Sequence, residues 1–270
     1  MIKNKTTTKK IAVVTGGNSG IGLYTALSLH NAGCTVYELS RRNIEHSGIT
    51  HIYADVTDES LVSLAIQQIL EKEERIDILV NCAGFGISGA VEFTENIDAK
   101  KQIDVNFFGM VHVTKAVLPF MRKNNQGRIV NISSVAAIAP IPFQTYYSAS
   151  KAAINAYSAA LANEVKPYGI SVTAILPGDI ATGFTDTRNK SALGDDEYGG
   201  RISRSVTKME QDEQNGMKPE KAGAYITKIA LKKKVKPMYT IGFTYKCISL
   251  LVKFLPCRLV NWLIGFLYSR

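Results

Sequence analysis

The sequence predicts an α/β fold in which helices cover both faces of a doubly wound parallel sheet. Short apolar runs rich in β-branched residues, typical of strands buried on both faces, alternate with longer helical patterns. These runs are IAVVT (11–15), CTVYEL (34–39), ITHIY (49–53), IDILVN (76–81), RIVNIS (128–133) and ISVTAIL (170–176). Because 270 residues with 46% hydrophobic content contain no Pro/Gly/Ser-rich linker, one domain is expected. In such a sheet the ligand binds at the carboxyl ends of the strands.

Charge and cysteine content narrow the class of protein. The chain has a net charge of +9, yet residues 221–270 contain ten Lys or Arg and no Asp or Glu, so the body is neutral and the tail is basic. Four cysteines without a C-x-x-C pair and four scattered histidines predict no metal site. Reduced cysteines fit a cytosolic setting. The first ten residues are basic and polar, unlike a secretory signal.

The first strand leads into a glycine-rich turn, TGGNSGIG (15–22), and then into a helical pattern. The spacing of its glycines matches the general dinucleotide fingerprint only in part. Glycines still let the backbone turn tightly and approach a pyrophosphate, which would rest on the start of the helix. A plain strand-to-helix turn is the alternative. The predicted cofactor-binding residues are Gly16, Asn18, Ser19, Gly20, Ile21 and Gly22.

The end of the second strand indicates which nicotinamide cofactor is preferred. Ser40 occupies the place where NAD-binding sheets carry an acidic residue, and Arg41 and Arg42 follow. Because guanidinium groups favour a 2′-phosphate, NADP(H) is preferred, with NAD(H) as the second choice. A solvated pair of arginines is the alternative. Glu38 should lie on the same strand face as Ser40, which weakens the preference.

The next two strand ends supply further candidate contacts to the cofactor. Asp55, followed by Val56, could reach an adenine edge, although a helix N-cap at Asp55 or Thr57 explains the same residues. After the fourth strand, the sequence NCAG would let the cofactor lie close to the backbone. Its predicted cofactor-binding residues are Asn81, Ala83 and Gly84.

The stretch QTYYSASKAA (144–153) carries the candidate acid. A helix is expected from about Tyr147, which places Tyr147 and Lys151 on one face and Tyr146 on another. A carbonyl that accepts hydride needs a proton, and a phenol can donate it if its anion is stabilised. A lysine ammonium and an oxidised nicotinamide should lower the pKa of Tyr147 from roughly 10. Tyr146 should line the substrate site or pack.

The sixth strand is followed by LPGDIATGF (176–184), where a turn could meet the nicotinamide carboxamide, although Pro-Gly also fits a plain turn. The residues assigned to the cofactor here are Pro177, Gly178, Ile180 and Thr182. Residues 184–218 are polar without strong periodicity, as expected of a mobile lid over the substrate.

Together these motifs resemble the short-chain dehydrogenase/reductase family. The motifs TGGNSGIG, NCAG, DVNFFG, GRIVNISS, YSASK and PG occur in this order between about residues 10 and 240. The resemblance implies a seven-stranded Rossmann-type sheet, a nicotinamide cofactor, a homodimer or homotetramer, and a catalytic group of Asn106, Ser134, Tyr147 and Lys151. Ser134, favoured over Ser133 by the family spacing, would hold the substrate oxygen. Asn106 would hold a water that relays protons through Lys151.

Apolar residues near the inferred carbonyl site suggest a lipophilic substrate, although core packing explains each of them singly. They are Phe85, Ile138, Ile141, Phe143 and Phe184.

The tail beyond the resemblance, 245–270, is apolar and basic. Ile248, Leu251, Val252 and Leu255 form one helical stripe, and after a break at Pro256 a second follows. The second stripe consists of Leu259, Trp262, Leu263, Phe266 and Leu267. The longest charge-free run is too short to span a bilayer. Two interpretations stay open: peripheral contact with a membrane surface, or a lid or subunit contact. Aliphatic rather than stacking side chains argue against nucleic acid.

The sequence therefore predicts a catalytic unit over 1–243, with its lid, and a helical extension over 244–270 that is not an independent domain. The expected activity is NADPH-preferring interconversion of a carbonyl and an alcohol on a lipophilic steroid, retinoid or acyl-type substrate. A 3-ketoacyl-thioester reductase is the alternative within the enzymes. A non-catalytic NADPH-binding sensor or membrane scaffold is the alternative outside them, although an intact Asn, Ser, Tyr and Lys group argues against it.

Overall fold

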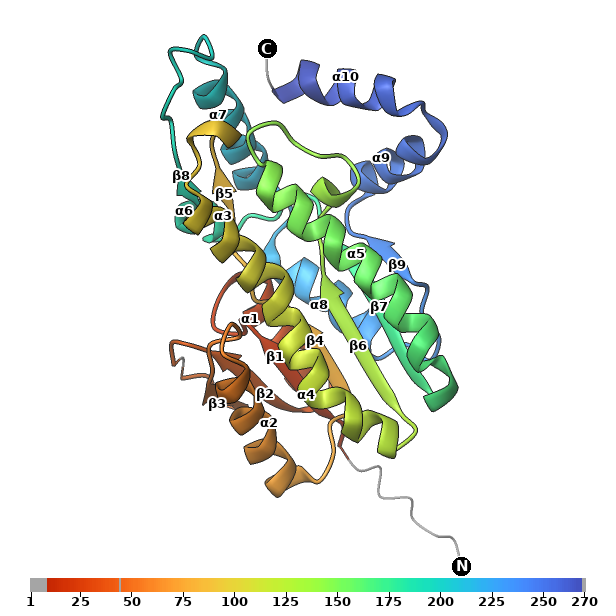
Figure 1. Cartoon of the computed structure of the whole chain (residues 1–270). Coiled ribbons are helices and arrows are strands. Elements are labelled where there is room, and N and C mark those ends of the chain that lie inside the picture. The colour runs from red at the N-terminus through yellow and green to blue at the C-terminus, as the bar shows by residue number, and fades with distance from the viewer. Residues whose placement is uncertain (1–8, 44, 269–270) are drawn as a thin grey trace, which may run out of the picture.

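The computed structural model describes residues 9–43 and 45–268, so the outermost parts of the two predicted units, 1–8 and 269–270, lie outside it. Seven parallel strands form one sheet in the order β3-β2-β1-β4-β6-β7-β9 (Figure 1). The strands are β1 (Ile11–Thr15), β2 (Thr35–Ser40), β3 (Ile49–Tyr53), β4 (Ile78–Asn81), β6 (Gly127–Ile132), β7 (Ile170–Leu176) and β9 (Met238–Thr240). The predicted doubly wound seven-stranded sheet is confirmed, and all six predicted runs are strands.

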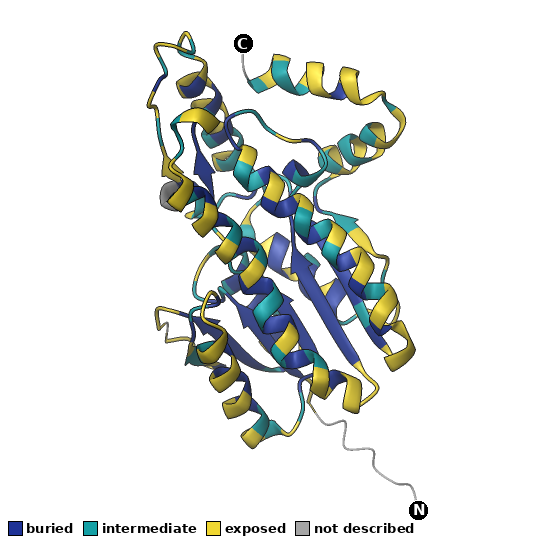
Figure 2. Ribbon diagram, viewed as in Figure 1, coloured by how far each residue is buried: buried dark blue, intermediate teal, exposed yellow. Residues whose placement is uncertain are grey.

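Helices cover both faces of the sheet because its strands are apolar on both sides. On β1, Val13 packs with one core, whereas Ala12 and Val14 pack with the other. The first core is closed by α2 (Glu59–Glu73), α4 (Gly109–Lys123) and α5 (Thr145–Val165), and the second by α1 (Gly20–Asn31) and α8 (Pro219–Ala230). Figure 2 shows the resulting buried sheet between exposed outer helix faces.

The strand order reverses next to β1, because β2 pairs on one side of it and β4 on the other. A crevice therefore opens at the carboxyl ends of these strands, where ligands bind in sheets of this kind. The glycine-rich turn after β1 enters this crevice.

Elements outside the main sheet, most of them short, build one side of the crevice. They are a two-residue pairing of β5 (Ile87–Ser88) with β8 (Asn189–Lys190), α3 (Asn96–Ile103), a π-helical turn η2 (Asp104–Phe108), α6 (Phe184–Thr187) and α7 (Arg201–Gln214). The short 3-10 turns are η1 (Val91–Phe93), η3 (Val135–Ala137) and η4 (Lys166–Tyr168). The expectation of no strong periodicity in 184–218 is wrong over α7, where Ile202, Ser205 and Met209 are buried on one face.

The tail forms two helices, α9 (Phe243–Phe254) and α10 (Cys257–Tyr268), which break at Pro256 as predicted. Figure 1 shows them above the carboxyl end of the sheet, with α10 running back toward α7. The first predicted stripe turns Ile248 and Val252 inward. The second stripe is divided: its members Leu263 and Leu267 line the cavity, while Trp262 is exposed. Val260 and Ile264, which lie outside the predicted stripe, also turn inward. Within the described part of the chain, no helix has both the length and the apolar character needed to cross a membrane.

Candidate active site

A single continuous cavity of about 1170 Å³ runs along the carboxyl ends of the strands and continues beneath α9 and α10. One end is walled by the glycine-rich turn and the end of β2. The middle contains Ser134, Tyr147 and Lys151, and the far end is walled by apolar side chains of the tail. The site therefore combines a long polar cleft with an apolar extension, and the two meet at the predicted catalytic group.

The glycine-rich turn has the geometry of a cradle for a pyrophosphate. Gly16 has φ +64°, and a side-chain carbon there would lie 2.9 Å from the Cα of Ala83. Ser19 occupies the N-cap position of α1, but its side chain makes no hydrogen bond to the amides of the helix. Free amide groups of the first helical turn therefore face the cleft, as an anion requires. The Thr15 hydroxyl accepts from the amides of Cys82 (3.0 Å) and Ala83 (3.1 Å), which fixes the turn against β4.

The end of β2 presents arginines to the cleft and keeps its acid below the surface. Arg41 and Arg42 line the cleft, and the Arg41 guanidinium lies 3.7 Å from the Asp55 carboxylate. Glu38 is fully buried, accepts from the Ser40 hydroxyl (3.2 Å) and is hydrogen-bonded to His51 Nδ1. The carboxylate that could have selected a ribose hydroxyl is thus engaged beneath the turn.

Asp55 is not a helix cap. Its carboxylate accepts from the amide (3.0 Å) and hydroxyl (2.8 Å) of Thr57, and these bonds hold its pKa below the usual value despite the opposing effect of burial. The N-cap of α2 is Asp58, which accepts from the amides of Ser60 and Leu61. The capping interpretation of Asp55 and Thr57 is therefore wrong, and Asp55 lies at the cleft wall.

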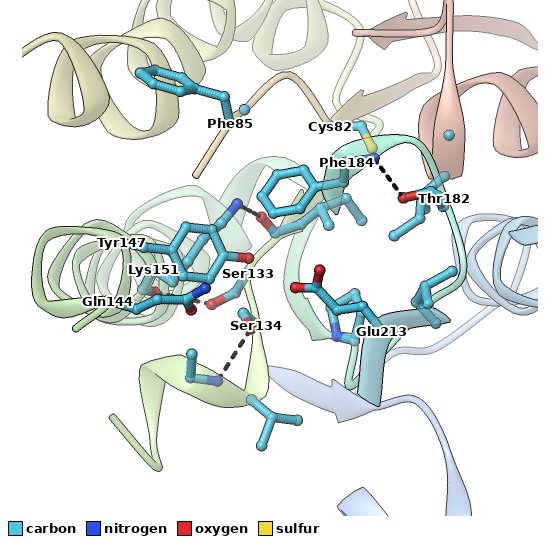
Figure 3. A pocket seen from close by; sticks show the side chains of 18 of the residues that line it. Cys82, Phe85, Ser133, Ser134, Gln144, Tyr147, Lys151, Thr182, Phe184 and Glu213 are labelled. Atoms are coloured by element: carbon cyan, nitrogen blue, oxygen red, sulfur yellow. Dashed lines mark hydrogen bonds between the residues drawn. The ribbon is translucent and has the colours of Figure 1, made fainter. Parts of the chain in front are cut away.

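The structure brings Tyr147, Lys151 and Ser134 together (Figure 3). Helix α5 begins at Thr145, slightly before the predicted start, and places Tyr147 and Lys151 on the face toward the cavity. The Lys151 ammonium lies 5.6 Å from the Tyr147 ring centroid and donates to the carbonyl of Ile132 (2.9 Å). The Ser134 hydroxyl accepts from the amide of Ala136 (3.1 Å) and lies near enough to the Tyr147 phenol to lower its pKa. Ser133 also lines the cavity, but its hydroxyl donates to the backbone of Lys151 (2.9 Å).

Within the protein itself, burial has the largest effect on the pKa of Tyr147. Burial raises the pKa of Tyr147 to about 12, and the hydrogen bond from Ser134 opposes this effect only in part. Burial also lowers the pKa of Lys151 to about 8, so the lysine is a weaker source of positive charge than a solvated one. A lowering of the Tyr147 pKa below its usual value therefore requires a positive charge in addition to that of Lys151.

Asn106 lies behind the cavity wall. It sits in the π-helical turn, where its side-chain oxygen accepts from the amide of Phe85 (2.9 Å) and its amide donates to the carbonyl of Phe85 (3.0 Å) and to Ser150 (3.0 Å). A side-chain carbon on Gly84 would lie 3.0 Å from the Asn106 oxygen and 3.6 Å from the Lys151 ammonium. Asn106 thus fixes the loop after β4 beside Lys151, and its role in a water relay stays a prediction.

Of the predicted cofactor-binding residues, all but Asn81 line the cavity. Those on the wall are Gly16, Asn18, Ser19, Gly20, Ile21, Gly22, Ser40, Arg41, Arg42, Asp55, Val56, Ala83, Gly84, Tyr147, Lys151, Pro177, Gly178, Ile180 and Thr182. The Asn81 side chain is buried and donates to Thr114 (3.1 Å) and Asn131 (2.9 Å), so it ties β4 to its neighbours instead. The residues present fit a dinucleotide cofactor.

The sequence predicted only some of the apolar residues that line the substrate end of the cavity. Phe85, Ile141 and Phe184 line the cavity as expected. Ile138 and Phe143 do not: Ile138 packs under α9, and Phe143 packs with Tyr198.

Several polar residues of the cavity wall were missed, among them Gln144, Asp179, Glu213 and Tyr245. Tyr245 lies so close to Gly178 that a side chain there would collide with its ring, and its phenol donates to Asp179. In the sequence, the only sign of such a contact is Gly178, the glycine of the predicted Pro-Gly turn. Within the described residues, no group of three or more His, Cys, Asp or Glu side chains is arranged to hold a metal ion.

The family follows from comparison with known proteins. Residues 10–192 match the short chain dehydrogenase family. The chain belongs to this family. A 3-ketodihydrosphingosine reductase of Bacteroides thetaiotaomicron is 43% identical to this short-chain dehydrogenase over 243 residues, which cover 87% of this chain and 90% of the relative.

Solved structures, among them that of a short-chain dehydrogenase, show the same architecture. One from Streptomyces avermitilis superposes with a TM-score of 0.81 at 27% identity, covering 95% of this chain and 96% of its own. The structure of ElxO with NADP bound gives a TM-score of 0.74 at 27% identity and covers 88% of this chain and 99% of that chain. The chain is therefore an oxidoreductase of a family that binds nicotinamide cofactors.

Proposed function

We propose that this short-chain dehydrogenase reduces the ketone of a long-chain lipid with NADPH, and that 3-keto sphingoid bases such as 3-ketodihydrosphingosine are its substrate class. The observation that carries the proposal is the apolar extension of the cavity, where Ile248, Val252 and Ile264 continue the site beyond Tyr147. An alkyl chain buried there contributes about 25 cal/mol for each Å² removed from water. The reductase of that name from Bacteroides thetaiotaomicron, 43% identical, supports the same class.

The chemistry rests on the three side chains in the middle of the cavity. When bound, NADPH would supply a hydride to the carbonyl carbon. Tyr147 donates its phenolic proton to the carbonyl oxygen, so that C=O becomes CH–OH, and Ser134 holds the same oxygen. Lys151 stabilises the phenolate that remains until a proton from solvent replaces the one donated.

The preference for NADPH follows from the end of β2. Arg41 and Arg42 offer two guanidinium groups next to Ser40, at the position where a ribose 2′-phosphate would lie. Glu38, the acid that would repel this phosphate, is engaged by His51 and fully buried. The similarity to ElxO, whose structure has NADP bound, agrees with this preference.

A carboxylate on the cavity wall favours an amino ketone over a thioester. Glu213 is paired with Arg188, whereas Asp179 accepts from the neutral phenol of Tyr245. Burial raises the pKa of Asp179, and the carboxylates of Asp212 and Glu213 also raise it, while the hydrogen bond from Tyr245 and the charge of Lys208 only partly oppose this. An ammonium group next to the reacting ketone, as in a 3-keto sphingoid base, would supply positive charge beside these carboxylates. The phosphates of a thioester carrier would instead add negative charge.

The test is to follow NADPH oxidation by the purified protein with three ketones of equal chain length. They are 3-ketodihydrosphingosine, the same ketone without its amine, and a 3-ketoacyl thioester. We expect kcat/KM to be highest for the amino ketone and turnover to vanish in Tyr147→Phe. Tyr146→Phe is the matched control, because Tyr146 does not line the cavity. Faster turnover of the thioester would favour that class instead. Cofactor binding without turnover of any ketone would favour a sensor.

A further inference from the structure

Helices α9 and α10 are apolar on both sides, although only one side of each is covered by protein. The inner sides bring Ile248, Val252 and Ile264 onto the core and the cavity. On the outer sides, the side chains of Phe254 and Trp262 are 80% and 57% exposed. Further exposed apolar residues of the two helices are Phe243, Leu250, Leu251, Leu259, Leu263, Phe266 and Leu267. We call this set the outer apolar face. It is much larger than the scattered exposed residues of an ordinary surface.

The outer apolar face is continuous with the cavity. Leu251, Leu263 and Leu267 line the cavity and yet are 54%, 38% and 60% exposed, respectively. These leucines therefore form an apolar rim where the cavity meets the outside, between α9 and α10. A lipid tail could pass this rim from an apolar phase without crossing a polar surface.

The charged residues that α9 and α10 themselves carry are all positive. Lys246, Lys253 and Arg258 lie on α9 and α10 among its exposed residues, and no Asp or Glu occurs after Glu220. A surface of this composition is complementary to anionic headgroups. It is poorly suited to a second copy of itself, because a two-fold contact would bring the same cations together.

We propose that the outer apolar face rests on an anionic bilayer and that the leucine rim is the route by which a lipid enters the cavity from it. Two phenols hold the helices over the site: Tyr245 donates to Asp179, and Tyr268 donates to Asp212 (3.4 Å) on α7. Neither bond uses the outer face, so the tail stays docked on the catalytic unit while its outer side contacts the membrane.

Trp262 makes this proposal directly measurable, because it is the only tryptophan of the chain and lies on the outer apolar face. We would add vesicles of phosphatidylcholine, with or without 30% phosphatidylglycerol (about a third anionic lipid, enough to attract a basic surface), to the full-length protein. Vesicles with anionic lipid should shift Trp262 emission to the blue, brominated acyl chains should quench it, and the protein should sediment with the vesicles. Neutral vesicles should bind at least about tenfold more weakly.

Variants separate the membrane surface from the rest of the protein. Phe254→Ser/Leu250→Ser keeps the tryptophan and should weaken vesicle binding at least about tenfold. Leu64→Ser/Phe120→Ser removes two exposed apolar residues on α2 and α4 and should leave binding unchanged. Lys253→Gln/Arg258→Gln should remove most of the preference for anionic vesicles. Each variant should turn over a short water-soluble ketone like the wild type, and only the outer-face variants should lose turnover of a long-chain ketone presented in vesicles.

Two results would overturn the proposal. The first is no change in emission or sedimentation with anionic vesicles. The second is a blue-shifted Trp262 without vesicles, in an oligomer that Phe254→Ser/Leu250→Ser dissociates, which would assign the face to a second copy. Because vesicle binding is read without turnover, failure of the membrane contact and failure of the proposed reductase activity are distinguishable.

Discussion

Lys151 is a single residue of the site that lowers the stability of the folded protein. Its side chain is buried, donates to one backbone carbonyl, and has a pKa lowered to about 8 by burial. Between pH 8 and 10.5 the unfolded chain therefore binds more protons at this position than the folded one, and stability rises with pH in this window. At neutral pH the change in the pKa of Lys151 from 10.5 to about 8 corresponds to roughly 3 kcal/mol against folding.

Lys151→Met should therefore abolish turnover and stabilise the protein. We expect a gain of about 1–3 kcal/mol in the free energy of unfolding at pH 7, measured in urea without cofactor, because a charged amine no longer has to be buried. The gain should shrink at pH 9.5, where the folded wild type is already largely neutral at this position. An equal gain at both pH values would contradict the assignment of the effect to the charge.

Asp179→Asn tests the recognition of a substrate amine. Asparagine still accepts from the Tyr245 phenol but carries no charge. We expect KM for the amino ketone to rise about tenfold, which corresponds to about 1.4 kcal/mol, while KM for the ketone without the amine stays unchanged. A parallel rise for both ketones would show that Asp179 supports only the fold.

Arg41→Ala/Arg42→Ala tests the choice of cofactor. We expect the Kd of NADPH, measured by fluorescence titration, to rise roughly tenfold to a hundredfold, because two charge-assisted contacts to a phosphate are lost. The Kd of NADH should change little. Since both side chains are exposed, stability serves as the control and should be unaffected. Equal losses for the two cofactors would remove the case for a phosphate site.

At the scale of elements, the wall of the substrate site depends on one buried ion pair. The Arg188 side chain is fully buried and pairs with Glu213, which also accepts from the Thr185 hydroxyl (2.5 Å). This network ties α6 and the strand after it to the end of α7. Glu213→Leu should cost about 3–5 kcal/mol in urea unfolding, because it leaves a buried guanidinium without its counter-charge. Arg188→Met/Glu213→Leu should recover most of this loss. If the double variant were as unstable as the single one, the ion pair would not be the cause.

The elements also show what the sequence can predict. The six apolar runs, the glycine turn and the Tyr147–Lys151 spacing depend on local pattern, and the structure has them where the pattern places them. The π-helical turn that holds Asn106 does not follow from local propensity, because it is selected by its contacts with Phe85 and Ser150. The sequence also could not predict which side of the helix that contains Trp262 faces the protein. When a helix is apolar all round, periodicity cannot say which side is covered.

In the molecule as a whole, the cavity is lined by parts of the chain that lie far apart in the sequence. The β1 turn, the β2 end, α5 and the tail all contribute to its wall. A dinucleotide seated along it would contact several of these parts at once and bind only the folded chain. Such a ligand stabilises the folded state by mass action.

NADPH should therefore raise the Tm of the protein. At one hundred times its Kd, the ligand adds about 2.7 kcal/mol, which for a domain of this size corresponds to a rise of about 5–10 °C. Gly16→Val is the decisive control, because a side chain at φ +64° would strain the turn and press on Ala83. This variant should melt at a lower temperature and show no rise with NADPH, whereas Leu64→Ser, on the far helix α2, should keep the full rise. A full rise in Gly16→Val would mean that the cofactor does not lie on the glycine turn, and the cavity would then have to bind its nucleotide elsewhere.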